Sequence, residues 1–289
     1  MESGNVALRC YTRQANPQKS MWQGRPHTPP LRHSRVLVFD TETTIDAYQN
    51  FKIGFFRIYQ EECFQHQGLF YDPSMLDRAE RTILESYAKR AGIELYELNE
   101  FIEEVFYPEV YVLHTLCIGY NLAFDISRIA QNAGKSRGRN QGGFTFTLSE
   151  DRFKPPIVIK QLGAANSFKF QSTARPEETQ KKAEKKNRRR FHFPGYFLDV
   201  QRLAEILLQE THISLERAAK KLHTNTQKIR GIEHGKVTEE YITYLIFDVI
   251  TTFEVYSHLL KELGHYQIQA PLTKIYSSAS LGKAALKQL

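Results

Sequence analysis

The stretch Arg35-Val-Leu-Val-Phe-Asp40-Thr41-Glu42-Thr43 decides the fold, because four apolar residues run directly into two acids. An apolar run of this length between polar residues is typical of a buried central strand. Side chains alternate between the faces of a strand, so Asp40 and Glu42 are expected to point the same way. Two adjacent carboxylates repel each other unless a cation lies between them, and a hard divalent ion suits oxygen ligands. An isolated Asp-x-Glu at a strand end is more often a polar turn, so the metal hypothesis depends on the rest of the chain.

Composition indicates a globular protein. The chain has 289 residues, of which 41% are hydrophobic and 25% charged, enough for a substantial core in one large domain or two small ones. No apolar run approaches the ~18 residues of a membrane span, and the start lacks the apolar core of a secretory signal. Three widely spaced cysteines predict neither a disulfide framework nor a zinc site. A cytoplasmic location is therefore expected (nucleoid-associated in a bacterium), while the Arg-, Ser- and Pro-rich start leaves an organelle or nucleus open.

The net charge of +7 is concentrated in two segments. Residues 1–35 hold six basic residues against one acid, and residues 166–190 hold nine against three. Such patches suit a polyanion such as nucleic acid, although solvated loops have the same composition. The run KKAEKKNRRR at 181–190 has no apolar period and is interpreted as a loop or hairpin tip.

Hydrophobic periodicity and turn residues predict one α/β domain over 34–270, with a mixed sheet flanked by helices. A disordered basic leader is expected at 1–33, a basic insertion at about 172–192, and a linker-like segment at 271–289. Strands are expected at 35–41, 52–60, 62–71, 111–120, 144–148, 157–162, 166–170 and 196–200, the second and third as antiparallel neighbours of the first. Helices are expected at 75–92, 94–106, 121–132, 201–209, 214–222 and 238–263.

Two further acids lie where apolar elements would bring them to the first pair. Asp125 lies in the first turn of the helix expected from Asn121, and Asp248 lies in an apolar part of the longest helix. Buried carboxylates are rare without a partner or a metal. Tyr244 precedes Asp248 by one helical turn, on the same face. Four converging acids suit two divalent ions about 3.5–4 Å apart that hold a phosphate, and a tyrosine can orient the attacking water.

The three motifs Asp40-x-Glu42, Asn121-x-x-Phe124-Asp125 and Tyr244-x-x-x-Asp248, in this order, resemble those of DEDD-type 3′–5′ exonucleases of the tyrosine branch. The Asn-x-x-Phe-Asp form, and Ser214-Leu215-x-x-Ala218 before the third motif, look like the exonuclease domain of family B DNA polymerases. The similarity covers about 35–289, and the closing passage resembles the link to the polymerase part. The resemblance implies a ribonuclease H-like fold.

The resemblance also implies an activity: hydrolysis of phosphodiester bonds at single-stranded DNA 3′ ends with release of nucleoside monophosphates, as in proofreading. Two Mg²⁺ or Mn²⁺ ions would be held by Asp40, Glu42, Asp125 and Asp248, and Tyr244 would orient the attacking water. Substrate contacts are expected from Thr41, Thr43, Asn121, Phe124, Ser214 and Leu215. The family's phosphate-contacting lysine has no firm match, and Lys221, Lys228 and Lys236 remain candidates.

Other interpretations stay open. The chain could be a non-catalytic nucleic-acid-binding or polymerase-docking module of the same fold, or could work with a polymerase domain or partner; no membrane contact is expected. The sequence contains no polymerase palm motif, so no polymerisation is expected. Singly, Asp125 could be a helix N-terminal acid, Tyr244 a core tyrosine and Ser214 a helix cap. Asp199 is expected to cap the helix at 201, and His114 to be a core histidine within a strand.

Overall fold

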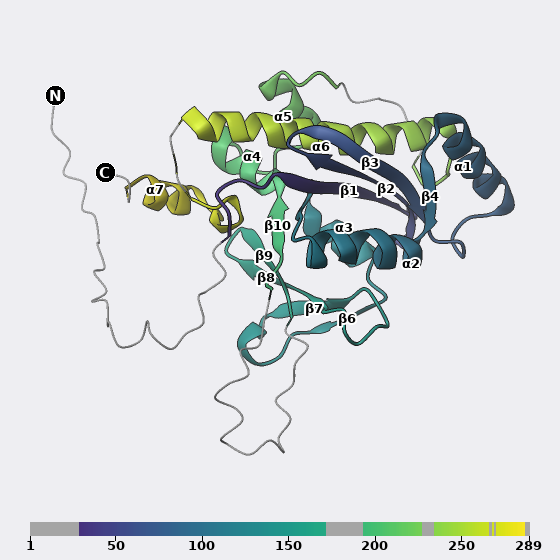
Figure 1. Cartoon of the computed structure of the whole chain (residues 1–289), viewed down its shortest axis with the longest axis horizontal. Helices are drawn as coiled ribbons and strands as arrows, with labels where there is room; N and C mark the ends of the chain where they lie inside the picture. The colour runs from purple at the N-terminus through teal and green to yellow at the C-terminus, as the bar shows by residue number, and fades with distance from the viewer. Residues whose placement is uncertain (1–28, 172–192, 227–233, 266–267, 269, 287–289) are drawn as a thin grey trace, which may run out of the picture.

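A mixed six-stranded sheet with the order β10-β5-β1-β2-β3-β4 forms the centre of the protein (Figure 1). The computed structural model describes residues 29–171, 193–226, 234–265, 268 and 270–286. The strands are β1 (Arg35–Thr43), β2 (Phe51–Gln60), β3 (Cys63–Tyr71), β4 (Glu94–Glu97), β5 (Leu116–Gly119) and β10 (Tyr196–Asp199). The prediction of an α/β domain with a mixed sheet flanked by helices is confirmed.

Strand directions bring three carboxyl ends to one edge of this sheet. β2 is an antiparallel neighbour of β1, as predicted, whereas β3 pairs with β2 and not with β1. β5 is parallel to both β1 and β10. Val38, Ile118 and Leu198 stand in register across β1, β5 and β10. Asp40 lies two residues beyond Val38 and Asp199 one beyond Leu198, so both acids reach the same edge.

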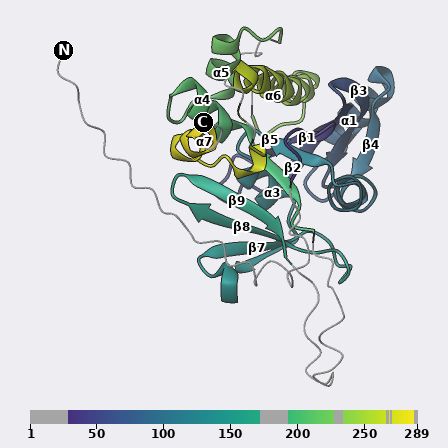
Figure 2. The same ribbon diagram turned by 60° about the vertical axis from the view of Figure 1, so that its left-hand side comes forward.

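Helices cover both faces of the main sheet. The longest, α6 (Glu239–His265), packs on β1 and β2, and α3 (Leu122–Arg128) packs against β1 and β5. Figures 1 and 2 both show these two helices on opposite sides of β1. α4 (Val200–Leu208) and α5 (Leu215–Leu222) pack against α6. α1 (Arg78–Ala91) begins with a capping box from Asp77 and ends at Gly92 in the left-handed region, as the sequence predicted.

A second, four-stranded antiparallel sheet contacts β10 through β9. Its strands are β6 (Asn132–Lys135), β7 (Gly143–Thr147), β8 (Ile157–Leu162) and β9 (Ala165–Phe170), with a 3₁₀ turn at Gly138–Asn140. The helix predicted at 121–132 is therefore too long, because α3 ends at Arg128 and β6 begins at Asn132. The predicted insertion at 172–192 and the run at 181–190 lie outside the described residues, as does the leader before residue 29.

Residues 94–120 depart most from the prediction. The helix expected at 94–106 is strand β4, then α2 (Leu98–Glu100), then a π-helix at Phe101–Val112 that continues through Pro108. Leu113 N donates to Pro108 O at 2.9 Å, five residues back, so the proline carbonyl takes part in the wide turns although its nitrogen has no hydrogen to donate. This helix buries Phe101, Phe106 and Tyr107, so tertiary packing overrides the local stop signal.

The strand expected at 111–120 is shortened to β5 for the same reason. His114, expected inside that strand, lies before it with φ 58° and stacks on Phe193 at 3.8 Å between ring centroids. Residues beyond 270 form a 3₁₀ turn at Leu272–Lys274 and helix α7 (Ser278–Leu286). In the part of the chain that the structure describes, every helix falls short of the length and apolarity that crossing a membrane requires.

Candidate active site

The acids of β1 lie beneath the first half of α6. Asp40 and Glu42 are both half-buried, and the hydroxyl of Tyr241 on α6 donates to Glu42 Oε2 at 2.5 Å. Burial raises the pKa of Asp40 well above its usual value, and the negative charges of Glu42 and Asp248 raise it further. The end of β1 is therefore an acidic centre that resists full ionisation.

Asp125 enters the same centre from α3. Its side chain is 1% exposed, and Thr41 Oγ1 donates to its Oδ1 at 2.8 Å. Its other oxygen, Oδ2, is buried without a hydrogen-bond partner among the described residues, and a Cβ added to Gly119 would lie 3.3 Å from it. Burial raises the pKa of Asp125, and the charge of Asp40 adds to this effect. Because Gly119 has no Cβ, there is room beside Asp125 Oδ2, the oxygen that accepts no hydrogen bond.

Asp248 reaches the centre from α6, where it is buried together with Tyr244. The pKa of Tyr244 is raised by burial, then by the charge of Asp248 and a hydrogen bond to it, and then by Glu42 and Asp40. The four acids predicted from the sequence, Asp40, Glu42, Asp125 and Asp248, therefore act on one another across three separate elements.

Two tyrosines, not one, line the helix side of the centre. The rings of Tyr241 and Tyr244 are almost parallel, with centroids 6.4 Å apart and an interplanar angle of 5°. His234 lies edge-on to both rings, with centroid distances of 5.7 Å to each. Tyr241 stands seven residues before Asp248 and so shares its helix face, a spacing from which its place beside the acids could have been predicted.

A buried ion pair holds the turn that leads into α6. Lys52 Nζ donates to Glu80 Oε1 at 2.7 Å and to Gly235 O at 2.8 Å, and Val237 N donates to the same Glu80 oxygen at 2.9 Å. β2, α1 and the 235–237 turn are tied together in this way, one turn before Tyr241. No short motif marks this network in the sequence, since its members are far apart along the chain.

The residues expected to contact substrate divide by exposure. Thr41 is buried and its hydroxyl is engaged by Asp125, whereas Thr43 is half-buried at the end of β1. Asn121 is exposed with φ 72° at the start of α3. The Arg128 guanidinium lies 4.7 Å from the centroid of the half-buried Phe124 ring, and it also donates to two backbone carbonyls of the 48–49 turn.

The predicted Ser214-Leu215 motif lies beside the motif that begins at Asn121. Ser214 is exposed and caps α5, accepting from Arg217 N at 3.3 Å, and Leu215 is buried. The Tyr120 hydroxyl donates to Ile213 O at 2.7 Å, which fixes this loop next to the start of α3. Asp199 caps α4 as predicted, with Oδ1 accepting from Gln201 N and Arg202 N.

The three candidate lysines have different positions. Lys221 forms an ion pair with Glu210, Lys236 is exposed in the turn before α6, and Lys228 lies outside the described residues.

The donor set suits hard divalent cations. Four carboxylates supply oxygen ligands, and the unpartnered, buried Asp125 Oδ2 is an acceptor available to a cation. Within the described residues, no three His, Cys, Asp or Glu side chains already form an arrangement that could hold a metal ion. Binding would therefore require the carboxylates to draw closer together around the ion. Comparisons of this chain with protein-family models, curated proteins and solved structures found no match.

Proposed function

We propose that the protein is a divalent-metal-dependent 3′–5′ exonuclease acting on DNA, similar to the exonuclease domain of family B DNA polymerases. The observation that carries this proposal is the meeting of Asp40, Glu42, Asp125 and Asp248 at one end of β1. The rise in the pKa of Asp40 and of Asp125, to which other carboxylates contribute, gives the cluster a reason to bind cations. Carboxyl groups that raise one another's pKa mark a candidate functional site, and two divalent ions held by such groups would assist displacement at a phosphate.

The order of the strands supports a ribonuclease H-like fold. Three antiparallel strands, β1 to β3, are followed by parallel strands β5 and β10 on the other side of β1. Helices lie on both faces, and the acids lie at the carboxyl end of the central strand. This arrangement gives the site a rigid floor formed by β1.

The chain's own residues would divide the work as follows. Asp40, Glu42, Asp125 and Asp248 would hold the ions, which when bound supply Lewis-acid stabilisation of charge on the phosphate. Thr41 fixes the rotamer of Asp125 through its hydroxyl. Tyr244 would orient the attacking water, and Tyr241 would keep Glu42 in place through their hydrogen bond.

The exposed rim suits a single-stranded 3′ end. Asn121 and Ser214 are exposed on neighbouring loops, and the half-buried Phe124 follows Asn121 by one turn of α3. Aromatic rings bind unpaired bases of any sequence by stacking. A polymerase domain or partner would supply such ends during proofreading.

The test is degradation of a 5′-labelled single-stranded oligonucleotide with Mg²⁺ or Mn²⁺. We expect a ladder of products shortened from the 3′ end and release of nucleoside monophosphates. Asp40→Ala/Glu42→Ala should abolish the activity, whereas Lys135→Ala, an exposed residue of β6, should leave it unchanged. Wild-type rates in the double variant would assign the activity to a contaminant and refute the proposal.

A non-catalytic nucleic-acid-binding or polymerase-docking module is the second candidate. It is favoured by the same finding that no described set of three side chains already has a metal-binding arrangement. DNA binding that is equally strong with and without divalent cations, together with no cleavage, would support it. Cation-dependent cleavage would exclude it.

A further inference from the structure

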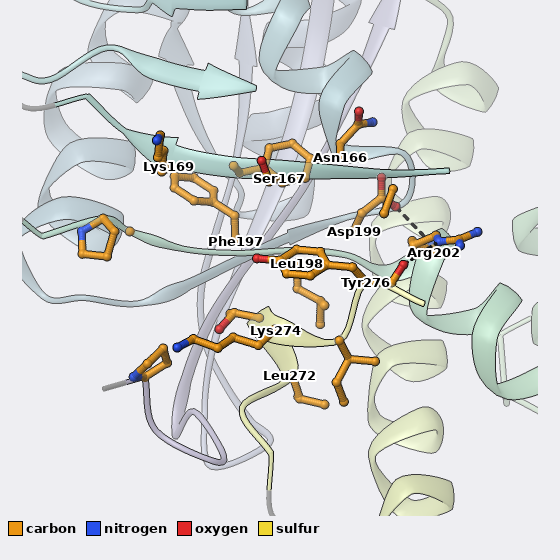
Figure 3. Close-up of a pocket in the computed structure, with 17 residues that line it drawn as sticks. Asn166, Ser167, Lys169, Phe197, Leu198, Asp199, Arg202, Leu272, Lys274 and Tyr276 are labelled. Carbon is orange, nitrogen blue, oxygen red and sulfur yellow. Dashed lines mark hydrogen bonds between the residues drawn. The ribbon is translucent and has the colours of Figure 1, made fainter. Parts of the chain in front are cut away.

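A cavity of about 250 Å³ lies between the two sheets, away from the tyrosines of the acidic centre. Its walls come from β9, β10, the start of α4 and the segment at 272–276. Phe168, Phe197 and Leu198 supply apolar surface, and Lys169 and Lys274 supply charge. Figure 3 shows the two lysines toward one end, Asp199 and Arg202 toward the other, and Phe197 and Leu198 between them.

The positive charges at the two ends of the cavity differ in whether a neighbouring side chain neutralises them. The Arg202 guanidinium is engaged, with NH1 donating to Glu205 at 2.6 Å and Nε to Tyr276 O at 3.3 Å. No ion pair to Lys169 or Lys274 is found in the described parts of the chain. The lysine end of the cavity therefore attracts an anion.

The aromatic wall and the two lysines define the chemistry of a ligand. Phe168 and Phe197 offer aromatic surface, and Lys169 and Lys274 offer positive charge. Two positive charges and an aromatic wall together suit a small anion that carries a planar group.

The cavity is also connected to the proposed cleavage site. Asp199 lines it and is level with Gly119 of β5, and its Oδ1 accepts from Asn121 N at 3.3 Å. β1 lies two strands from β10, so the separation from Asp40 is on the order of 10 Å at the usual strand spacing. A bound molecule would thus lie close to the exposed loop that begins α3.

We propose that this cavity is a second site, which binds one nucleotide with its phosphate at Lys169 and Lys274 and its base between Phe197 and Asp199. The volume lies just below the roughly 300 Å³ at which pockets for drug-sized ligands begin, so the cavity encloses part of one nucleotide and leaves its phosphate beside the exposed Lys274. The identity of the ligand rests on the proposed function, which generates nucleotides next to the cavity. The nucleotide is either a released monophosphate or one unit of a bound strand.

Binding of dAMP, measured by calorimetry in EDTA, separates this cavity from the acidic centre, which without cations repels phosphate. Lys169→Ala/Lys274→Ala should weaken binding at least tenfold, a change of at least ~1.4 kcal/mol. Lys160→Ala, on β8 and outside the cavity, is the matched control and should bind as the wild type does.

A second measurement identifies the source of the nucleotide. If the cavity takes one unit of a strand, the double lysine variant should bind (dT)8 more weakly by a similar factor. If it takes only the free product, (dT)8 binding should be unchanged while inhibition of cleavage by dAMP is relieved. Absence of dAMP binding to the wild type, or equal binding by the double variant, would overturn the proposal. Binding of dAMP without any nuclease activity would support the cavity and refute the proposed function.

Discussion

Two clusters of buried charge flank the first turns of α6, and they are built in opposite ways. Lys52 and Glu80 have opposite charges, and each is at most 9% exposed; both bond further to the backbone of the 235–237 turn. Asp125 and Asp248, equally buried, meet Asp40 and Glu42, so that cluster holds four acids. Removing one member of an ion pair leaves the other charge buried without its partner, which destabilises the fold. Neutralising one acid of a like-charged cluster instead relieves repulsion. The first arrangement is suited to holding structure and the second to binding cations.

The largest expected effect comes from one acid of the cluster. Asp40→Asn should lower the rate of DNA cleavage about a thousandfold, equivalent to ~4 kcal/mol, because a cation ligand is lost. The metal-free variant should be no less stable than the wild type in urea, since a repelling charge has been removed. Equal losses of activity and stability would place Asp40 in a structural role.

Lys52→Met tests the ion pair between Lys52 and Glu80. Unlike Asp40→Asn, it should lower the stability of the fold. Leaving Glu80 buried without its partner should reduce the free energy of unfolding by about 3 kcal/mol, measured by urea denaturation. The double variant Lys52→Met/Glu80→Leu should recover part of this loss. If Lys52→Met were as stable as the wild type, the pair would not hold the turn before α6.

The pH dependence of stability separates the two clusters without mutation. Burial raises the pKa of Asp199 to about 6, and burial and like charges raise the pKa of Asp40 and Asp125. The folded, metal-free protein therefore binds protons more readily than the unfolded chain. Its free energy of unfolding should rise as pH falls through the folded pKa values, until the usual carboxyl pKa near 4 is reached.

Asp199 should contribute about 2 kcal/mol to this rise in the free energy of unfolding, after allowance for the partial exposure of its side chain. Asp199→Asn keeps a good helix cap, so it should remove that share between pH 6 and pH 4 without unfolding α4. Glu80, whose pKa is lowered, contributes in the other direction and loses its stabilising effect below its usual pKa. A wild-type pH profile in Asp199→Asn would show that this acid is solvated.

The smallest expected effect on the cleavage rate comes from Tyr241, and comparison with Tyr244 distinguishes the roles of the two tyrosines. Tyr241→Phe removes one hydrogen bond to Glu42 and should lower the cleavage rate about tenfold, or ~1.4 kcal/mol, through a poorly placed ligand. Tyr244→Phe should lower the rate further and alter its dependence on pH if Tyr244 orients the water. The opposite ranking would exchange their roles.

The sequence predicted β1 and β2 well because both are nearly continuous apolar runs that are buried along most of their length. It also predicted the caps at Asp199, Ser214 and Gly92, which depend on residues only a few positions away. It failed at Pro108, where burial of Phe101 and Phe106 outweighs the local preference for a helix end. Tyr241 and the Lys52–Glu80 pair were missed because their partners lie 199 and 28 residues away.

Calorimetric titration of the metal-free protein with Mn²⁺ at pH 7 tests the central claim, that the four acids form a cation site. Two ions per chain are expected to bind, with a rise in melting temperature and release of protons as the carboxylates ionise. Asp40→Asn/Asp125→Asn should bind neither ion tightly, while Lys135→Ala should bind both. Absence of Mn²⁺ binding to the wild type, or undiminished binding by the double variant, would contradict the claim.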